Sequence, residues 1–446
     1  MGEPATNRRQ LGFFSATAAV IATMIGAGIF GATGGFAYQL GSDENVLLVW
    51  LFCGLLALTG ALSLGELGAM LPRSGGSYAY NRHLYGETAG YLSGVLSWLL
   101  AFVGAVAYIT LLLGHHVQQL IPNLPPTLTA AMAIVVFTSI HCLGLREGNR
   151  VNNVFTIFKV GVILAFIIAG FSVPAQASVA EGGSHPGILS APFAAAMISA
   201  SFAYLGWETT TWIAGDLRDP QKNLPRSLIA GTALVTILYL LLNAVFLRAQ
   251  SASTMTGEIE GIGLHAASTL FSGNVSYWFN LMIIIVLLST TSTVLMVGAR
   301  FLATMAQDGH LPAPLGKTTS WNASINALIV QAFLTIIFTC AASTHESADA
   351  VLIFICLPTT IVMAASVIGV ILLRHREPNT HRPFRVPLYP LPPLMFVALS
   401  IWMVVSTIQF KWQASLGSLA LILVFWFLKP VLASRKANDS LLKDTS

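Results

Sequence analysis

The stretch that decides the fold reads Ile25-Gly26-Ala27-Gly28-Ile29-Phe30, and it interrupts an apolar run from Phe13 to about Tyr38. About 20 helical residues, at 1.5 Å each, cross the hydrocarbon core of a bilayer, so this run is long enough to span a membrane. Two glycines at its midpoint weaken the helix where main-chain polar groups find no water. Such a gap is tolerated only where the opened backbone is buried in protein or lines a cavity.

A second interrupted segment lies further along the chain. The apolar stretch from Pro192 to Leu217 carries residues 202–208, Phe-Ala-Tyr-Leu-Gly-Trp-Glu, near its middle. It is the sixth hydrophobic segment of the chain, and the interrupted run described above is the first. Two interrupted segments at matching places in two halves are the best sequence indication of a transporter's substrate site.

The composition excludes a soluble protein. Of 446 residues, 55% are hydrophobic and only 9% are charged, against about 25% charged in a soluble average. The first apolar run is too long for the core of a cleavable signal peptide, and residues 1–12 are polar. The net charge of +4 reflects loop residues, and we expect no nucleic-acid partner. The four cysteines lie in apolar runs and show neither a disulfide framework nor a zinc spacing, so we expect no metal and no cofactor.

Twelve transmembrane segments are predicted, with Pro and Gly at many of their boundaries. We place them at residues 13–38, 45–71, 88–121, 127–144, 152–173, 192–217, 226–249, 274–306, 324–343, 348–373, 391–410 and 414–433. With the N-terminus inside, 19 of the 22 Lys and Arg residues are cytoplasmic, Arg248 and Lys411 are outside, and Lys159 lies within the membrane. This asymmetry predicts a multi-pass protein of the plasma membrane with both termini in the cytoplasm.

The segments divide into two groups of five. Residues 13–173 and 192–373 each hold five segments, and because five is odd the second half starts from the opposite side of the membrane. This arrangement is that of an inverted repeat. Segments 11 and 12, residues 391–433, form an appended hairpin, and residues 1–12 and 434–446 are cytoplasmic tails. The predicted fold is therefore an all-α polytopic membrane protein.

The chemistry of the two breaks predicts an α-amino acid site. Freed N–H groups after Gly28 lie at a half-helix N-terminus, which favours a carboxylate. Freed carbonyls before the break suit an ammonium group, and the second break offers the same pair. Gly26, Gly28 and Gly31 also match a dinucleotide-binding fingerprint, but that reading needs a strand and a βαβ unit. Small residues such as Gly28 and Ala32 additionally favour close helix packing, which is compatible with a site.

Glu208 is a carboxylate at mid-membrane depth. Its charge costs about 2.5–3.5 kcal/mol at a helix centre, which makes the residue a functional candidate. Three roles remain open from the sequence: balancing a cationic substrate, carrying a coupling proton, or fixing the fold through a bond to a neighbouring helix. Burial makes protonation of this carboxyl near neutral pH conceivable.

Lys159 lies seven residues into the fifth segment, about 10 Å from its cytoplasmic end. One interpretation is that its side chain reaches back to the membrane interface. The other places its ammonium between the first and eighth segments, where a sodium ion would otherwise sit. The hydroxyl run at residues 289–293 in the eighth segment is compatible with a sodium site or with bonds to helix carbonyls. The two functional interpretations compete, because a lysine in the site excludes sodium.

Aromatic residues flank the second break. Phe202 and Trp207 are candidates for closing the site off from one side, with simple packing as the alternative. A channel would need a continuous polar lining, which few segments provide. A membrane-embedded enzyme would need a catalytic constellation, and no His-Glu-x-x-His, Asp pair or Gly-x-Ser-x-Gly is present. We therefore expect a transporter rather than an enzyme, with a channel as a distant alternative.

Several motifs in order along the chain resemble the amino acid/polyamine/organocation (APC) superfamily. They are Ile25-Gly-Ala-Gly-Ile-Phe30, Gly65-Glu-Leu-Gly68, Leu71-Pro-Arg-Ser-Gly-Gly-Ser-Tyr78, Asn223-Leu-Pro-Arg226 and Ala306-Gln-Asp-Gly-His-Leu-Pro312. Residues 151–159 and 382–387 are most similar to the L-type amino acid transporter (LAT-like) branch and its bacterial relatives.

This resemblance implies a LeuT-like 5+5 inverted repeat that works by alternating access. It implies that residues 25–29 and 202–208 hold the amino acid's carboxylate and ammonium. It implies sodium-independent transport in which Lys159 replaces the cation. In the similar arginine/agmatine antiporter, a glutamate at the place of Glu208 is linked to proton sensing.

The sequence departs from the family pattern at a few positions. Ala27 stands where the family commonly has Ser, and Glu208 where many L-type members have Asn. Phe202 and Ala105 replace residues of the arginine/agmatine antiporter, and the small Ala105 leaves room for a substrate side chain. We therefore expect an exchanger or proton-coupled symporter of neutral L-amino acids. The alternative is a transporter of cationic amino acids or polyamines that uses Glu208 as counter-charge.

The substrate-binding residues predicted from the sequence are Ile25, Gly26, Ala27, Gly28, Ile29, Ala105, Phe202, Ala203, Leu205, Gly206, Trp207 and Glu208. Lys159 and Glu208 are the predicted coupling residues. The loop at residues 122–126 lacks the cysteine that tethers animal L-type members to a glycoprotein, so we expect no disulfide-linked heavy chain. The sequence leaves the oligomeric state open.

Overall fold

The chain is helical throughout the part that the computed structural model describes. That part comprises residues 11–26, 28–177, 185–188, 190–259, 261–271, 275–319, 323–341, 345–410 and 412–432. The only β-type pairing within these residues is an isolated bridge between Leu11 and Leu217. The all-helical fold expected from the sequence is therefore confirmed for the described residues.

The helices follow the hydrophobic segments closely. The α-helices are α1 (Phe13–Met24), α2 (Gly28–Leu40), α3 (Asp43–Met70), α4 (Ser77–Tyr85), α5 (Glu87–Leu96), α6 (Ala105–Leu120), α7 (Pro126–Cys142), α8 (Leu145–Ser172), α9 (Ala191–Ala203), α10 (Thr209–Trp212), α11 (Pro220–Ala249), α12 (Ile262–Leu270), α13 (Val275–Gln307), α14 (Ile325–Ala341), α15 (His345–Arg376), α16 (Leu391–Phe410) and α17 (Trp412–Leu432). A π-helix, η2 (Ser97–Gly104), joins α5 to α6, and short 3-10 turns include η3 (Ala214–Asp216) and η5 (Ala313–Gly316).

Seven helical stretches in the described residues are long and apolar enough to cross a bilayer. An eighth arises if α1 and α2, which meet at a bend of 41°, count as one interrupted span. Shorter apolar helices, α7, α9, α14 and part of α17, cover further hydrophobic segments. Multiple membrane crossings are therefore supported, whereas the number twelve stays a prediction.

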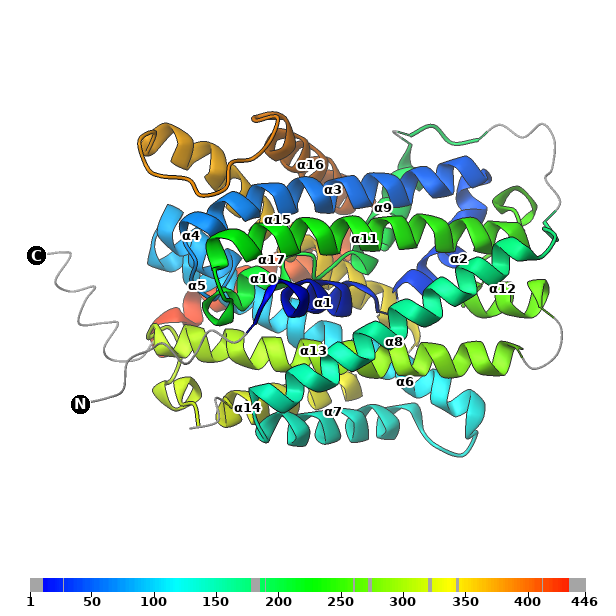
Figure 1. Cartoon of the computed structure of the whole chain (residues 1–446), viewed down its shortest axis with the longest axis horizontal. Coiled ribbons are helices and arrows are strands. Elements are labelled where there is room, and N and C mark those ends of the chain that lie inside the picture. Colours follow the sequence, from blue (N-terminus) through cyan, green and yellow to red (C-terminus); the bar gives the residue numbers. More distant parts are fainter. Residues whose placement is uncertain are drawn as a thin grey trace, which may run out of the picture.

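The short helix α1 lies at the centre of the bundle. It packs against the long helices α8, α11 and α13, and α2 packs against α9. Figure 1 shows α3, α11 and α13 running along the long axis, with α3 packed on α11 and α1 between α11 and α13. Because long helices surround it, the end of α1 is shielded from lipid and water alike, which is the setting that an interrupted helix requires.

A buried charge network fixes one end of α3. Glu66 is 1% exposed and receives two hydrogen bonds from Arg374 of α15, at 2.9 and 2.6 Å. Arg382 Nε lies 3.3 Å from the same carboxylate, and the Val386 main-chain N–H donates to it at 2.7 Å. One acidic side chain thus joins α3, α15 and the segment that leads to α16.

Replacing Glu66 by glutamine is expected to destabilise the fold. Two guanidinium groups would lose their buried counter-charge, and removing one partner of a buried pair typically costs about 3 kcal/mol or more. The melting temperature of the purified protein in detergent measures the effect. Glu44→Gln is the matched control, because Glu44 is exposed in the first turn of α3. Equal melting temperatures for the two variants would contradict the assignment.

Candidate functional site

The two helix breaks occur where the sequence places them. Helix α1 ends at Met24 and α2 begins at Gly28, while α9 ends at Ala203 and the short α10 begins at Thr209. Gly206 lies in the second gap with φ +97°, a backbone conformation that only glycine adopts without strain. The gap at residues 204–208 therefore depends on the glycine at its centre.

The two breaks are in direct contact with each other. A Cβ atom added to Gly28 would lie 2.8 Å from the Cα of Ala203, so main chain meets main chain at this point. On the other side of the contact, Thr23 Oγ1 lies 3.1 Å from the carbonyl oxygen of Gly206 and 2.6 Å from Thr209 Oγ1. The open ends of α1, α2, α9 and α10 thus converge on one small volume.

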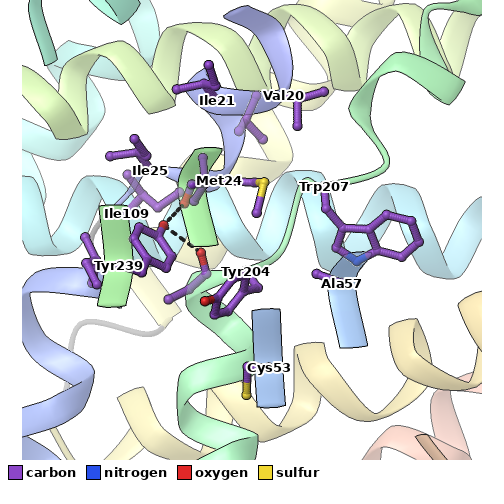
Figure 2. Close-up of a cluster of buried hydrophobic side chains, with 14 of the residues drawn as sticks. Val20, Ile21, Met24, Ile25, Cys53, Ala57, Ile109, Tyr204, Trp207 and Tyr239 are labelled. Atoms are coloured by element: carbon purple, nitrogen blue, oxygen red, sulfur yellow. Dashed lines mark hydrogen bonds between the residues drawn. The ribbon is translucent and has the colours of Figure 1, made fainter. Parts of the chain in front are cut away.

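Tyr239 of α11 binds the ends of both broken helices. Its hydroxyl lies 2.6 Å from the carbonyl oxygen of Met24 and 2.9 Å from that of Ala203. Figure 2 shows Tyr239 between the two breaks, with dashed lines to both carbonyls. Met24 and Ala203 are the last residues of α1 and α9, so one side chain serves the same position in both interrupted helices.

Lys159 of α8 occupies the carbonyl end of α1. Its Nζ lies 3.0 Å from the carbonyl oxygen of Ala22, 2.9 Å from that of Ile25 and 3.2 Å from Thr290 Oγ1. The side chain is 0% exposed, so it does not extend to the membrane interface. The Thr290 hydroxyl also donates to the Ile25 carbonyl at 2.8 Å. Two carbonyls and a hydroxyl around one cation resemble the oxygen shell that a sodium ion would need.

A cavity opens between the two breaks. The space available to the centre of a water molecule is about 40 Å³, which holds a few waters at most. Its walls are Thr23, Met24, Gly26, Gly28, Ala101, Ala105, Ile109, Phe202, Ala203, Leu205, Gly206, Glu208, Trp212, Thr290, Val294 and Met363. The open helix ends supply polar main-chain groups on one side, and η2 and α6 supply small and apolar side chains on the other.

Glu208 is the one acidic side chain among these lining residues, and it is 2% exposed. Its Oε2 accepts a hydrogen bond of 3.4 Å from the Ser77 hydroxyl at the start of α4. The glycine-rich loop before α4 packs against α10, because the N–H groups of Gly75 and Gly76 donate to the carbonyls of Trp212 and Thr211. The loop motif therefore supports the second break, a role that its sequence alone did not indicate.

Most of the residues predicted to bind substrate line this cavity. They are Gly26, Gly28, Ala105, Phe202, Ala203, Leu205, Gly206 and Glu208. Phe202 contacts Tyr108 of α6, with ring centroids 5.2 Å apart, at the edge of the cavity. Ile25 and Ile29 are buried in the core and do not line it, and Ala27 lies outside the described residues.

Trp207 differs from its predicted place, because its side chain is not part of the cavity wall. It is buried against Gly60 of α3 and Phe396 of α16, with the two ring centroids 5.9 Å apart. Figure 2 shows the indole ring directed away from Tyr239. The residue sits inside the turn at 204–208, where successive side chains point in different directions, so adjacency to the break did not fix its orientation.

Sequence reasoning missed Trp212, Tyr239 and Thr23. Trp212 closes the cavity on the side of α10 and meets Phe102 of η2 edge to face, with ring centroids 4.7 Å apart and an angle of 64° between the ring planes. Tyr239 and Thr23 lie in apolar runs. A threonine hydroxyl in a helix usually bonds a carbonyl of its own helix, and the sequence does not show which partner a tyrosine hydroxyl reaches. Only the tertiary arrangement brings their hydroxyls to a second helix.

Comparison with known proteins assigns the family. The sequence model of a family described as amino acid permease matches residues 11–428. The chain belongs to the amino acid permease family.

Three of its similar relatives span most of the chain. The large neutral amino acids transporter small subunit 2 of Mus musculus is 29% identical over 89% of this chain and 77% of its own length. The serine/threonine exchanger SteT of Bacillus subtilis (strain 168) is 27% identical over 90% of this chain and 91% of its own. The Asc-type amino acid transporter 1 of Mus musculus is 26% identical, over 95% and 82% respectively. This permease thus groups with transporters of the LAT-like branch.

The contact between Gly28 and Ala203 yields a matched pair of variants. Gly28→Ala places a methyl group 2.8 Å from the α9 backbone, so α2 and α9 must separate and the site is distorted. Gly31→Ala adds the same group three residues later in α2, where nothing lies within 4 Å. We expect a lower melting temperature and loss of amino acid uptake for Gly28→Ala only. Equal behaviour of the two variants would argue against a tight contact at Gly28.

Proposed function

We propose that this protein transports neutral L-amino acids by alternating access, without sodium, as an exchanger or a proton-coupled symporter. The observation that carries the proposal is the pair of interrupted helices that meet at one cavity while the ammonium of Lys159 occupies the carbonyl end of the first. The transporter family and the names of the relatives support the substrate class. Neither the family nor the names of the relatives support a catalytic role.

The open helix ends match the two charges of an α-amino acid. The first N–H groups of α2, beginning at Gly28, have no acceptor within their own helix, and Gly28 itself lines the cavity, which suits the α-carboxylate. The carbonyls at the end of α9, around Phe202 to Leu205, suit the α-ammonium. A backbone-lined site of this kind recognises the groups that all amino acids share.

The side chain of the substrate faces the apolar wall. Ala101 and Ala105 are small, and Ile109 and Phe202 give an apolar surface around them. Because the cavity is only about 40 Å³ in this closed form, these walls must move to admit a substrate. On one side of the cavity, the rings of Phe202 and Tyr108 must move apart to let the substrate in. We therefore assign the gating role to Phe202 rather than to Trp207.

Lys159 makes sodium unnecessary in this proposal. Its ammonium already donates hydrogen bonds to the carbonyls of Ala22 and Ile25 and to the Thr290 hydroxyl. A sodium ion would need the same oxygens, and two cations at one set of ligands repel each other. The coupling ion is then a proton or a counter-transported amino acid.

Glu208 favours a second candidate, a transporter of cationic amino acids or polyamines. A carboxylate in the cavity wall is a natural counter-charge for such a substrate. The relatives named for neutral amino acids and for serine and threonine argue for the neutral class. We therefore assign Glu208 to proton coupling, with the hydrogen bond from Ser77 as its link to α4.

For the architecture we propose twelve crossings in a 5+5 inverted repeat, residues 13–173 and 192–373, followed by the hairpin at 391–433. The Lys and Arg distribution supports a plasma membrane protein with cytoplasmic termini. We also propose that the chain works without a disulfide-linked heavy chain, because the loop between α6 and α7 contains no cysteine.

Uptake into proteoliposomes tests the function. Labelled L-alanine and L-leucine should enter vesicles that are preloaded with unlabelled amino acid or held at an inward proton gradient, equally with and without sodium. Lys159→Ala removes the side-chain donor of the buried Ala22 carbonyl, at about 1–3 kcal/mol, and leaves Ile25 with the Thr290 hydroxyl alone. It should reduce uptake without creating sodium dependence. Lys222→Ala, at an exposed lysine, is the control. Uptake of L-arginine but of no neutral amino acid would favour the cationic alternative.

The coupling role of Glu208 predicts a change in pH dependence. Glu208→Gln keeps the size of the side chain but removes its titratable proton, so uptake should vary less with pH than uptake by the wild type. Ser77→Ala removes the hydrogen bond and keeps the carboxyl, so its uptake should still vary with pH. A Glu208→Gln profile identical to that of the wild type would exclude the role.

A further inference from the structure

A second, larger cavity lies at the end of the bundle that carries α4 and the C-terminus of α13. The space open to the centre of a water molecule is about 670 Å³, which is in the range of small-molecule sites. Charged residues of both signs line it, among them Arg82, Asp216, Arg300 and Asp308. In the proposed orientation this cavity faces the cytoplasm.

The second cavity follows the first along helix α13 and along the chain segment after Trp212. Val294 of α13 lines the first cavity and Arg300 lines the second. Their separation of six positions along the helix corresponds to about 9 Å. In the same way Trp212 closes the first cavity, whereas Gly215 and Asp216 border the second. Helix α13 and the chain segment from α10 to η3 therefore contribute to the walls of both cavities.

Two layers separate the cavities. The first is aromatic: the buried ring of Phe102 lies 4.7 Å from that of Trp212 and 5.4 Å from that of Phe301, measured between centroids. The second is an ion pair, in which Arg300 Nη2 lies 2.5 Å from Asp216 Oδ2. An amino acid that leaves the first cavity in this direction has to pass both layers.

The ion pair does not use the full donor capacity of Arg300. Its Nη1 is buried and has no hydrogen-bond partner within the described residues. A guanidinium group presents paired N–H donors that match a carboxylate with two parallel bonds. Asp216 offers the opposite charge directly beside it, with its side chain 9% exposed.

We propose that Arg300 and Asp216 form a second binding site for the α-amino acid, in which the ion pair opens, Arg300 takes the α-carboxylate and Asp216 takes the α-ammonium. The site rests on the transport function proposed above. Separating this partly buried pair removes from each side chain its contact with the opposite charge. A zwitterion replaces both partners at once, whereas a lone anion or cation replaces only one. The side chain of the substrate then lies in the second cavity, which has room for it.

Cysteine labelling tests the site separately from transport. Thr304→Cys places a thiol in the wall of the second cavity, one helical turn from Arg300. It is introduced into the full chain with Cys142 and Cys340 replaced by Ser, while Cys53 and Cys356 are buried. Ala105→Trp is added to fill the first cavity, so any protection arises elsewhere. The rate of modification by a polar thiol reagent is then measured in detergent with and without L-alanine.

L-Alanine is expected to slow labelling at least threefold in the Ala105→Trp background. An equimolar mixture of acetate and methylammonium, which carries the two charges on separate molecules, should protect less. Combining Arg300→Gln with Asp216→Asn replaces the charges by amides of similar size and should abolish protection by L-alanine. The milder Arg300→Lys keeps the positive charge and should retain part of the protection by L-alanine. This variant serves as a control in case the double variant misfolds.

The outcomes separate the two proposals. No protection in the Ala105→Trp background, or protection that persists in the amide pair, overturns the second site. Undiminished uptake by Ala105→Trp in proteoliposomes would instead overturn the assignment of the first cavity, and with it the proposed transport route. Loss of uptake together with intact, charge-dependent protection supports both.

Discussion

The structure depends on finding donors for the main-chain carbonyls at the end of α1. A helix that stops inside an apolar bundle leaves its last carbonyls without partners, and no water is present to replace them. Lys159 and Thr290 serve Ala22 and Ile25, and Tyr239 serves Met24. These donors come from α8, α13 and α11, so the gap itself fixes how three long helices are placed around α1. The break is therefore an organising element as well as a site.

The breaks and the intramembrane charges were accessible from sequence because each violates a strong local rule. Glycine at the middle of an apolar span, as at Gly26, Gly28 and Gly206, has a clear physical cost in a helix. A lysine or glutamate at membrane depth has a larger one. The helices do end at Met24 and Ala203, and Lys159 is buried at the end of α1. Residues that are costly in an ordinary membrane helix are therefore the ones whose structural or functional role the sequence can predict.

Other parts of the site obey every local rule and were not visible in the sequence. Tyr239 and Trp212 are ordinary residues of apolar helices, and their importance comes from which neighbour they face. Trp207 illustrates the converse, because it is next to the break in sequence yet packs on Gly60. The orientation of a side chain in a non-helical turn depends on φ and ψ values that the residue types do not determine. Tertiary contacts, rather than position along the chain, decide these cases.

The hydroxyl of Tyr239 carries a single hydrogen but faces two acceptors. At any instant it donates to the carbonyl of Met24 or to that of Ala203, and the other oxygen keeps a lone pair that the hydroxyl does not fill. One of the two carbonyl oxygens is therefore always without the hydrogen bond from Tyr239. A small rotation of the O–H bond changes which of the two oxygens that is. An N–H-bearing substrate that reaches this oxygen can bond to it while the hydroxyl stays bonded to the other helix.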